Sequence, residues 1–245
     1  MEEVSLKAQQ LFNIGGFHVT NGLLVAIIVS LFLIAFSVIF RSKIKLVPGK
    51  VQSGVEMLAE MFLNLMASVL GSKEKAEKYL PLVLSIFIFI LLSNWTGVLP
   101  GVGSILFKSG GNEVPLFRSP AADLNFTLAF AVMAVLVTNF FGVAILGIFS
   151  HLKKFLNFSN PINFFVGILE LLSEMAKFIS FSFRLFGNIF AGEVLLAIMF
   201  FLVPYLVPVP FMMLEMFFGA IQAFVFAMLT LVFLTLHTTE HGIEH

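Results

Sequence analysis

The sequence predicts an all-α integral membrane protein, and its composition and two apolar runs carry this prediction. Of its 245 residues, 59% are hydrophobic and only 11% are charged, and the mean hydropathy is +1.04. A soluble chain of this length needs more polar surface than that. Residues 23–40 carry no charge and are numerous enough to cross a bilayer. Residues 161–203 have no internal proline and predict one helix roughly twice as long as the ~30 Å hydrocarbon core is thick.

We expect five or six membrane helices in a single membrane domain that covers residues 1–245. The predicted elements are a first transmembrane helix at 23–40, an amphipathic surface helix at 48–71, transmembrane helices at 79–99 and 124–150, and a long tilted hairpin of helices at 161–203 and 211–237. The surface helix has polar residues every four positions, at Gln52, Glu56, Glu60 and Asn64, which places them on one face. Glycines and prolines between 101 and 122 predict an external loop, and the prolines of VPYLVPVP predict the hairpin turn.

The basic residues predict the orientation in the membrane. Of the 14 Lys and Arg residues, positions 41, 43, 45, 50, 73, 75, 78, 153 and 154 fall at the ends predicted to be cytoplasmic. Positions 7, 108 and 118 fall outside, and positions 177 and 184 fall inside the membrane. By the positive-inside rule the N-terminus is external and the C-terminus forms a short cytoplasmic tail. The acidic start of the chain, with Glu2 and Glu3, does not resemble a signal peptide.

Several function classes are disfavoured by residues that are absent or poorly placed. The chain has no cysteine, so disulfides and thiolate chemistry are excluded. Its acidic and basic residues balance, so nothing suggests a nucleic-acid partner. The motif H-x-x-E-H occurs at His237, Glu240 and His241. Because only four residues follow it, a solvated polar tail is favoured over a zinc peptidase site. The histidines fall at predicted helix ends, which disfavours haem.

Arg184 is the most informative residue, because it lies inside an apolar run. A guanidinium cannot lose its proton and costs roughly 2.5 to 3.5 kcal/mol at the centre of a bilayer, so an intramembrane arginine is by default functional. Helical geometry places small and polar residues within about 60° of it, and these could let another helix approach closely. They are Ser173, Lys177, Ser180, Gly187, Asn188 and Ala191.

The predicted hairpin supplies Arg184 with no acidic partner. A turn near residues 203 and 204 pairs residues whose numbers add up to about 407, which sets Arg184 opposite Gln222 and Glu193 opposite Glu215. The arginine then faces an amide, and its counter-ion is expected from another subunit. Asn188 and Gln222 are equally well explained as contacts between helices. Near the cytoplasmic interface, charged residues are spaced to neutralise one another: Glu170, Glu174 and Lys177.

The sequence resembles subunit a of the F-type ATP synthase over most of its length. The resemblance is carried by PGKVQ, SNWTGVLP, SPAADLNFT, SFRLFGNIFAGE and IQAFVFAMLTLVF. It implies a non-catalytic stator subunit without a cofactor, which forms two ion half-channels beside a ring of c subunits and binds the b-subunit stalk of the ATP synthase complex. It also implies a bacterial inner membrane, with the plastid thylakoid membrane as the alternative. Ion translocation is then expected at Arg184, Asn188, Glu193, Glu215 and Gln222, and the candidate cytoplasmic half-channel contains Glu170, Glu174, Lys177 and Ser180.

One feature departs from the family pattern. Many members pair a glutamate with a histidine where this chain has Glu193 and Glu215, so a shared proton between two facing carboxylates is expected here. They would form a proton relay or, alternatively, a hydrogen-bonded pair that ties two helices together. A subunit of another ion-translocating complex, or a secondary transporter, is the competing function, although the internal repeats common in transporters are not evident. The coupling ion, proton or sodium, depends mainly on the ring.

Overall fold

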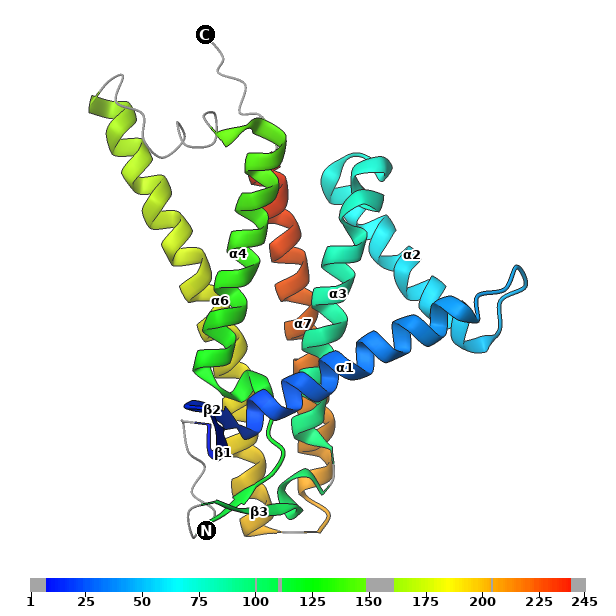
Figure 1. Ribbon diagram of the computed structural model, residues 1–245, viewed down its shortest axis with the longest axis vertical. Helices are drawn as coiled ribbons and strands as arrows, with labels where there is room; N and C mark the ends of the chain where they lie inside the picture. The colour runs from blue at the N-terminus through cyan, green and yellow to red at the C-terminus, as the bar shows by residue number, and fades with distance from the viewer. Residues whose placement is uncertain (1–7, 100, 110–111, 149–160, 204, 239–245) are drawn as a thin grey trace.

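Long helices make up most of the structure (Figure 1), which is a computed structural model describing residues 8–99, 101–109, 112–148, 161–203 and 205–238. Six of these helices are long and apolar enough to cross a membrane, as the sequence predicts. Their bounds are α1 Asn21–Ser42, α2 Lys50–Leu70, α3 Lys73–Val98, α4 Leu124–Leu146, α6 Pro161–Leu202 and α7 Pro208–Thr238. The chain is therefore an all-α membrane protein in its main architecture.

The first two long helices diverge from the others in Figure 1. A short hairpin of β1 (Gln10–Ile14) and β2 (Phe17–Thr20) precedes α1. The hydroxyl of Thr20 caps this helix by accepting from the Leu23 amide. The buried residues of α1 lie in its first three turns, and most of its remaining apolar residues are exposed. Helix α2 packs against α3 through the buried side chains of Phe62 and Met66, while its position on the membrane surface stays a prediction.

Helix α3 begins six residues before the predicted start. Ser72 caps it by accepting from the Lys75 amide, and Glu74 lies in its first turn, where a negative charge suits the helix dipole. Pro81 lies inside this helix and removes one backbone donor. The Ser85 hydroxyl donates to the Pro81 carbonyl at 2.6 Å. Because the first turns of α3 are charged, they are not part of the apolar run from which the helix was predicted.

The loop between α3 and α4 contains secondary structure that the sequence did not predict. It has a second hairpin, β3 (Leu106–Ser109) with β4 (Asn112–Pro115), between two short 3-10 helices, η1 (Val102–Ser104) and η2 (Pro120–Ala122). The buried Asp123 then caps α4 by accepting from the Asn125 amide at 3.0 Å. Helix α4 ends at Leu146, four residues before the predicted end.

The two C-terminal helices form the predicted hairpin. Helix α6 has 42 residues and runs along most of the long axis in Figure 1. At about 1.5 Å per residue it is roughly 63 Å long, so it exceeds the ~30 Å hydrocarbon core. Helix α7 begins three residues before the predicted start, at Pro208. Both Pro208 and Pro210 lie in its first turn, where a missing N–H costs no helical hydrogen bond.

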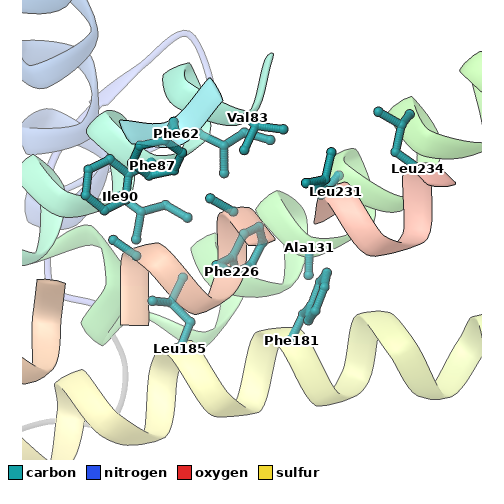
Figure 2. Packing of buried hydrophobic residues seen from close by; sticks show 14 of the residues in the cluster. Phe62, Val83, Phe87, Ile90, Ala131, Phe181, Leu185, Phe226, Leu231 and Leu234 are labelled. Atoms are coloured by element: carbon teal, nitrogen blue, oxygen red, sulfur yellow. The ribbon is translucent and has the colours of Figure 1, made fainter. Parts of the chain in front are cut away.

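Helix α7 lies at the centre of the bundle and contacts α3, α4 and α6. The core that joins these helices is apolar and includes several rings (Figure 2). The ring centroid of Phe226 of α7 lies 4.8 Å from that of Phe181 of α6 and 5.5 Å from that of Phe130 of α4, and the rings are tilted against one another. This packing fixes the side of α6 that faces inward and therefore the side that is left free.

The bundle has two distinct ends in Figure 1. The strands β1, β2 and β3 and the turn between α6 and α7 lie at one end, which we call the strand end. The first turns of α3 and α6 and the last turns of α7 lie at the other, which we call the far end.

Candidate functional site

Arg184 lies on the outer face of α6, away from the core. Phe181, Leu185 and Ile189 are buried on the opposite face of the same helix. The exposed face carries the small and polar residues that the sequence predicts around the arginine: Ser180, Gly187, Asn188 and Ala191. A side chain added at Gly187 would meet no atom within 4 Å. The surface of α6 around Arg184 is therefore formed by small side chains, so a partner helix could approach it closely.

The guanidinium of Arg184 has no carboxylate partner among residues 8–99, 101–109, 112–148, 161–203 and 205–238. Its one hydrogen bond within these ranges runs from Nη2 to the Ser180 hydroxyl, at 3.3 Å. A neutral hydroxyl one turn away does not compensate a full positive charge. That another subunit supplies the counter-ion stays a prediction.

Gln222 contacts a residue one turn away from the predicted one. Its side-chain oxygen accepts from Asn188 Nδ2 at 2.7 Å, and the Gln222 side chain is buried. The hairpin register had set Gln222 opposite Arg184 and is wrong by about one turn there. Long antiparallel helices cross at an angle, so the residue numbers of facing pairs do not keep a constant sum along the hairpin.

Glu215 lies nearer the strand end and is buried against Gly192. A Cβ added at residue 192 would stand 2.8 Å from the Glu215 Cδ and Oε1 atoms. The Glu215 Oε2 atom is buried and, in the part of the chain that is described, has no hydrogen-bond partner. A cavity of about 360 Å³ joins this carboxylate to the amide pair, with Asn188, Gly192, Phe211, Leu214, Glu215 and Gln222 among its lining residues.

Glu193 and Glu215 lie close enough for their charges to interact, as predicted, but the carboxylate of Glu193 binds Arg118 rather than Glu215. Arg118 Nε donates to Glu193 Oε1 at 2.9 Å, and Nη2 donates to Oε2 at 2.8 Å. The Arg118 side chain is only 6% exposed. Within the described ranges no hydrogen bond joins the two glutamates. Sequence reasoning had counted Arg118 as an external loop charge, and nothing in a single sequence links it to a residue 75 positions later.

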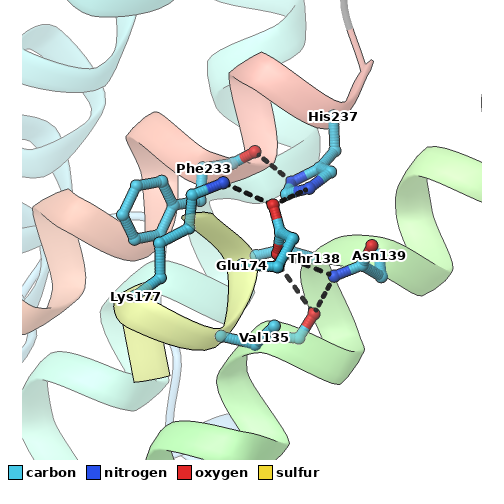
Figure 3. Close-up of polar contacts among 7 residues, drawn as sticks. All are labelled: Val135, Thr138, Asn139, Glu174, Lys177, Phe233 and His237. Carbon is cyan, nitrogen blue, oxygen red and sulfur yellow. Dashed lines mark hydrogen bonds and ion pairs between the residues drawn. The ribbon is translucent and has the colours of Figure 1, made fainter. Parts of the chain in front are cut away.

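A second polar cluster lies near the far end, inside the bundle (Figure 3). The buried carboxylate of Glu174 forms an ion pair with Lys177, as predicted. It also contacts His237 Nε2 at 3.0 Å and accepts from Asn139 Nδ2 at 3.4 Å. His237 is 1% exposed, so its assignment to a solvated tail is wrong.

The other residues considered at this end are Glu170 and the remaining members of the H-x-x-E-H motif. Glu170 is half-buried one turn before Glu174. Glu240 and His241, the remaining members of the H-x-x-E-H motif, lie outside the described residues. In the described ranges no three His, Asp or Glu side chains gather as a metal ion would require.

Comparison with known proteins identifies the family. The family model described as ATP synthase A chain matches residues 23–235. The chain is 32% identical over 225 residues to the ATP synthase subunit a of Moorella thermoacetica, which covers 92% of this chain and 94% of the relative. The chain belongs to the ATP synthase subunit a family. It is also 35% identical to the ATP synthase subunit a of Campylobacter concisus, over 84% of this chain and 85% of the relative. It is 37% identical to the ATP synthase subunit a of Mycobacterium bovis, over 87% of this chain and 85% of the relative.

Membership of the ATP synthase subunit a family gives the function in outline. The chain is a non-catalytic, proton-translocating stator subunit of the ATP synthase complex, and it crosses the lipid bilayer several times. A secondary transporter and a subunit of an unrelated ion-translocating complex are thereby set aside. No covalent reaction has to be assigned to the polar residues, which leaves proton transfer and electrostatic control as their chemistry.

Proposed function

We propose that the chain forms two proton half-channels that open to opposite sides of the membrane and meet the carboxylates of a c-subunit ring at Arg184. Because each half-channel crosses only part of the bilayer, a proton must travel on the ring between them. Ring rotation is then coupled to proton flow. Each proton that crosses a potential of 100 mV yields about 2.3 kcal/mol, so a direct leak past the arginine would waste that energy.

The observation that carries this proposal is the guanidinium of Arg184 on the exposed, small-residue face of α6, which has no carboxylate partner among the described residues. A fixed positive charge there attracts an arriving ring carboxylate and favours its ionised form, which releases the proton. Once the carboxylate leaves, the charge repels any proton that would pass directly between the half-channels. The shallow face formed by Gly187 and Ala191 gives a ring helix room to reach the arginine.

The outer half-channel is proposed to occupy the strand end. It would contain Glu193, Glu215 and the cavity that reaches Asn188 and Gln222. Glu215 is the proton carrier in this proposal, because its Oε2 atom is free of hydrogen bonds in the described structure. The amide pair of Asn188 and Gln222 ends the path one turn from Arg184.

The inner half-channel is proposed to occupy the far end. The turns of α6 that lead from Arg184 toward that end carry Ser180, Lys177 and Glu174 in succession. Glu170 lies one turn further. This assignment places the far end in the cytoplasm, in agreement with the basic residues at the start of α3. The membrane is proposed to be the bacterial inner membrane, with the thylakoid membrane as the alternative. The exposed apolar face of α1 is available to lipid or to the b-subunit stalk.

A crosslinking experiment tests the position of the ring. The chain has no native cysteine, so a cysteine introduced at Ala191 carries a photoreactive label at one site. In the whole ATP synthase we expect this label to capture the c subunit. The matched control is Leu136→Cys on α4, which is 63% exposed on a different helix and should capture none. Capture of the c subunit from position 136 but not from position 191 would contradict the proposal.

A further inference from the structure

His237 and Glu174 meet in the interior of the bundle although they lie 63 positions apart in the sequence. His237 is in the last turn of α7, and Glu174 is on α6, ten residues before Arg184. Both side chains are almost fully buried (Figure 3). Burying an imidazole and a carboxylate together costs desolvation energy that an apolar pair of the same size would avoid. Stability alone therefore does not explain why these two residues are present.

The hydrogen bonds of His237 fix where its protons lie. Its Nδ1 atom stands 2.7 Å from the Phe233 carbonyl oxygen, which can only accept, so Nδ1 carries a hydrogen. A neutral imidazole has one N–H, and Nε2 would then direct a lone pair at the Glu174 oxygen 3.0 Å away. That contact becomes favourable only when a further proton lies between the two atoms. The pair is therefore either an imidazolium with a carboxylate or a neutral imidazole accepting from a carboxylic acid.

The groups around the pair set the net charge of the cluster. The Lys177 ammonium contacts the same Glu174 oxygen and lies 4.8 Å from the centre of the Phe233 ring. From α4, the neutral amide of Asn139 faces the carboxylate. With Lys177 charged, the cluster has a net charge of +1 when the extra proton is present and zero when it is absent. The extra proton therefore gives the cluster its net charge, which a buried site of low polarity disfavours.

We propose that Glu174 and His237 form the proton-binding pair of the inner half-channel, which receives protons released near Arg184 and passes them to the cytoplasmic side. In each transfer one proton arrives between His237 Nε2 and Glu174 Oε1, and one proton leaves toward solution, so the pair returns to its starting state. The inference rests on the proposed function and adds to it a histidine at the end of α7. That histidine takes part in both the receiving and the releasing step.

The test compares substitutions in the whole ATP synthase, in membrane vesicles, with the amount of assembled complex measured alongside proton flux. His237→Gln and Glu174→Gln keep a hydrogen-bonding side chain but cannot carry the proton. We expect normal assembly and a loss of proton flux per complex of at least about tenfold, a threshold set below the roughly 100- to 10,000-fold that a positioned proton-transfer group typically contributes. Asn139→Leu is the matched control, because it removes a contact to Glu174 without removing a titratable group, and it should keep most of the flux.

Two outcomes would overturn the inference. If His237→Gln assembles and conducts at the normal rate per complex, the pair carries no proton. If His237→Gln and Asn139→Leu both lower the amount of complex and leave the flux per complex unchanged, the cluster only ties α4, α6 and α7 together. Should neither glutamine variant assemble, the exchange Glu174→His with His237→Glu keeps one acid and one base on the same helices. This exchanged pair is expected to conduct, and normal assembly without flux would overturn the inference.

A parallel Arg184→Ala variant separates failure of this inference from failure of the proposed function. Lost coupling in Arg184→Ala together with normal flux in His237→Gln would reject only the proton-binding pair. Retained coupling in Arg184→Ala would reject the two half-channels themselves.

Discussion

The guanidinium of Arg118 holds the carboxylate of Glu193 at the strand end, through hydrogen bonds of 2.9 Å from Nε to Oε1 and 2.8 Å from Nη2 to Oε2. Arg118 comes from the loop before α4, and Glu193 comes from α6, so the pair joins the loop between α3 and α4 to α6. Within the described residues Glu193 is held by a cation and Glu215 is not, which predicts different roles for the two glutamates.

Arg118→Ala is predicted to weaken the fold and to lower proton flux. Removing one partner of a buried ion pair costs about 3–5 kcal/mol. Because the Glu193 side chain is 32% exposed, solvent screens part of that cost, and we expect about 2 kcal/mol. The measurement is the temperature at which the purified complex dissociates, together with ATP-driven proton pumping in vesicles.

The double variant Arg118→Ala with Glu193→Gln is the control for this prediction. It removes the carboxylate that the single variant leaves without its cation, so assembly should recover relative to Arg118→Ala alone. Equal assembly of the single and double variants would mean that the pair contributes nothing to the fold.

Glu215→Gln is predicted to reduce proton flux more than Glu193→Gln does. Glu215 has a buried oxygen without a hydrogen-bond partner in the described structure, whereas both oxygens of Glu193 are engaged by Arg118. A carboxylate whose two oxygens are both held by a guanidinium is fixed in an ion pair and is less free to reorient along a proton path. Proton pumping by the two single variants, normalised to the amount of complex, gives the comparison. A larger loss in Glu193→Gln, at equal assembly, would reverse the assignment.

Gly192→Ala is predicted to displace the Glu215 carboxylate without unfolding the subunit. The new Cβ would stand 2.8 Å from the Glu215 Cδ and Oε1 atoms, which are at the end of a side chain and can move. We expect proton flux to fall several-fold while the complex assembles normally. Gly54→Ala in α2 is the matched control, because the added Cβ meets nothing within 4 Å. Flux in Gly192→Ala equal to that of the control would show that the position of Glu215 is unimportant.

Gly97→Ala is predicted to destabilise the contact between α3 and the loop that carries Arg118. Its Cβ would stand 2.7 Å from the Ser119 Cβ and 3.4 Å from two backbone atoms of that residue. Ser119 is buried, and its hydroxyl donates to the Ser93 carbonyl at 3.1 Å, so it cannot easily move. Overpacking of this kind costs about 1–3 kcal/mol. Thermal dissociation of the complex is the measurement, and Gly103→Ala, with open space around it, should dissociate at the normal temperature.

The long helices could be predicted from the sequence because each is defined by a local apolar run. Helices α3 and α7 begin a few residues before their predicted starts. Their first turns contain charged residues or prolines, which are compatible with the start of a helix but do not belong to an apolar run. The two β-hairpins were missed for the opposite reason. Their strands have only four or five residues and lie in polar, glycine-containing loops.

The candidate site could be predicted only where it depends on one helix. The exposed face around Arg184 follows from helical periodicity, and the ion pair of Glu174 with Lys177 follows from their spacing. Arg118 and His237 could not be found in this way, because each reaches its partner through tertiary packing across more than sixty residues. A buried histidine at the end of an apolar helix looks, in sequence alone, like the first residue of a polar tail.

The most direct test of the account is ATP synthesis by vesicles in which Arg184 is replaced by Ala. Because the guanidinium has no carboxylate partner in the described structure, its loss should leave assembly intact. We expect ATP synthesis driven by a proton gradient to be abolished. Arg184→Lys should also fail, since an ammonium is a smaller point charge that can lose its proton in an apolar site. Normal coupled synthesis by the assembled Arg184→Ala complex would contradict the account.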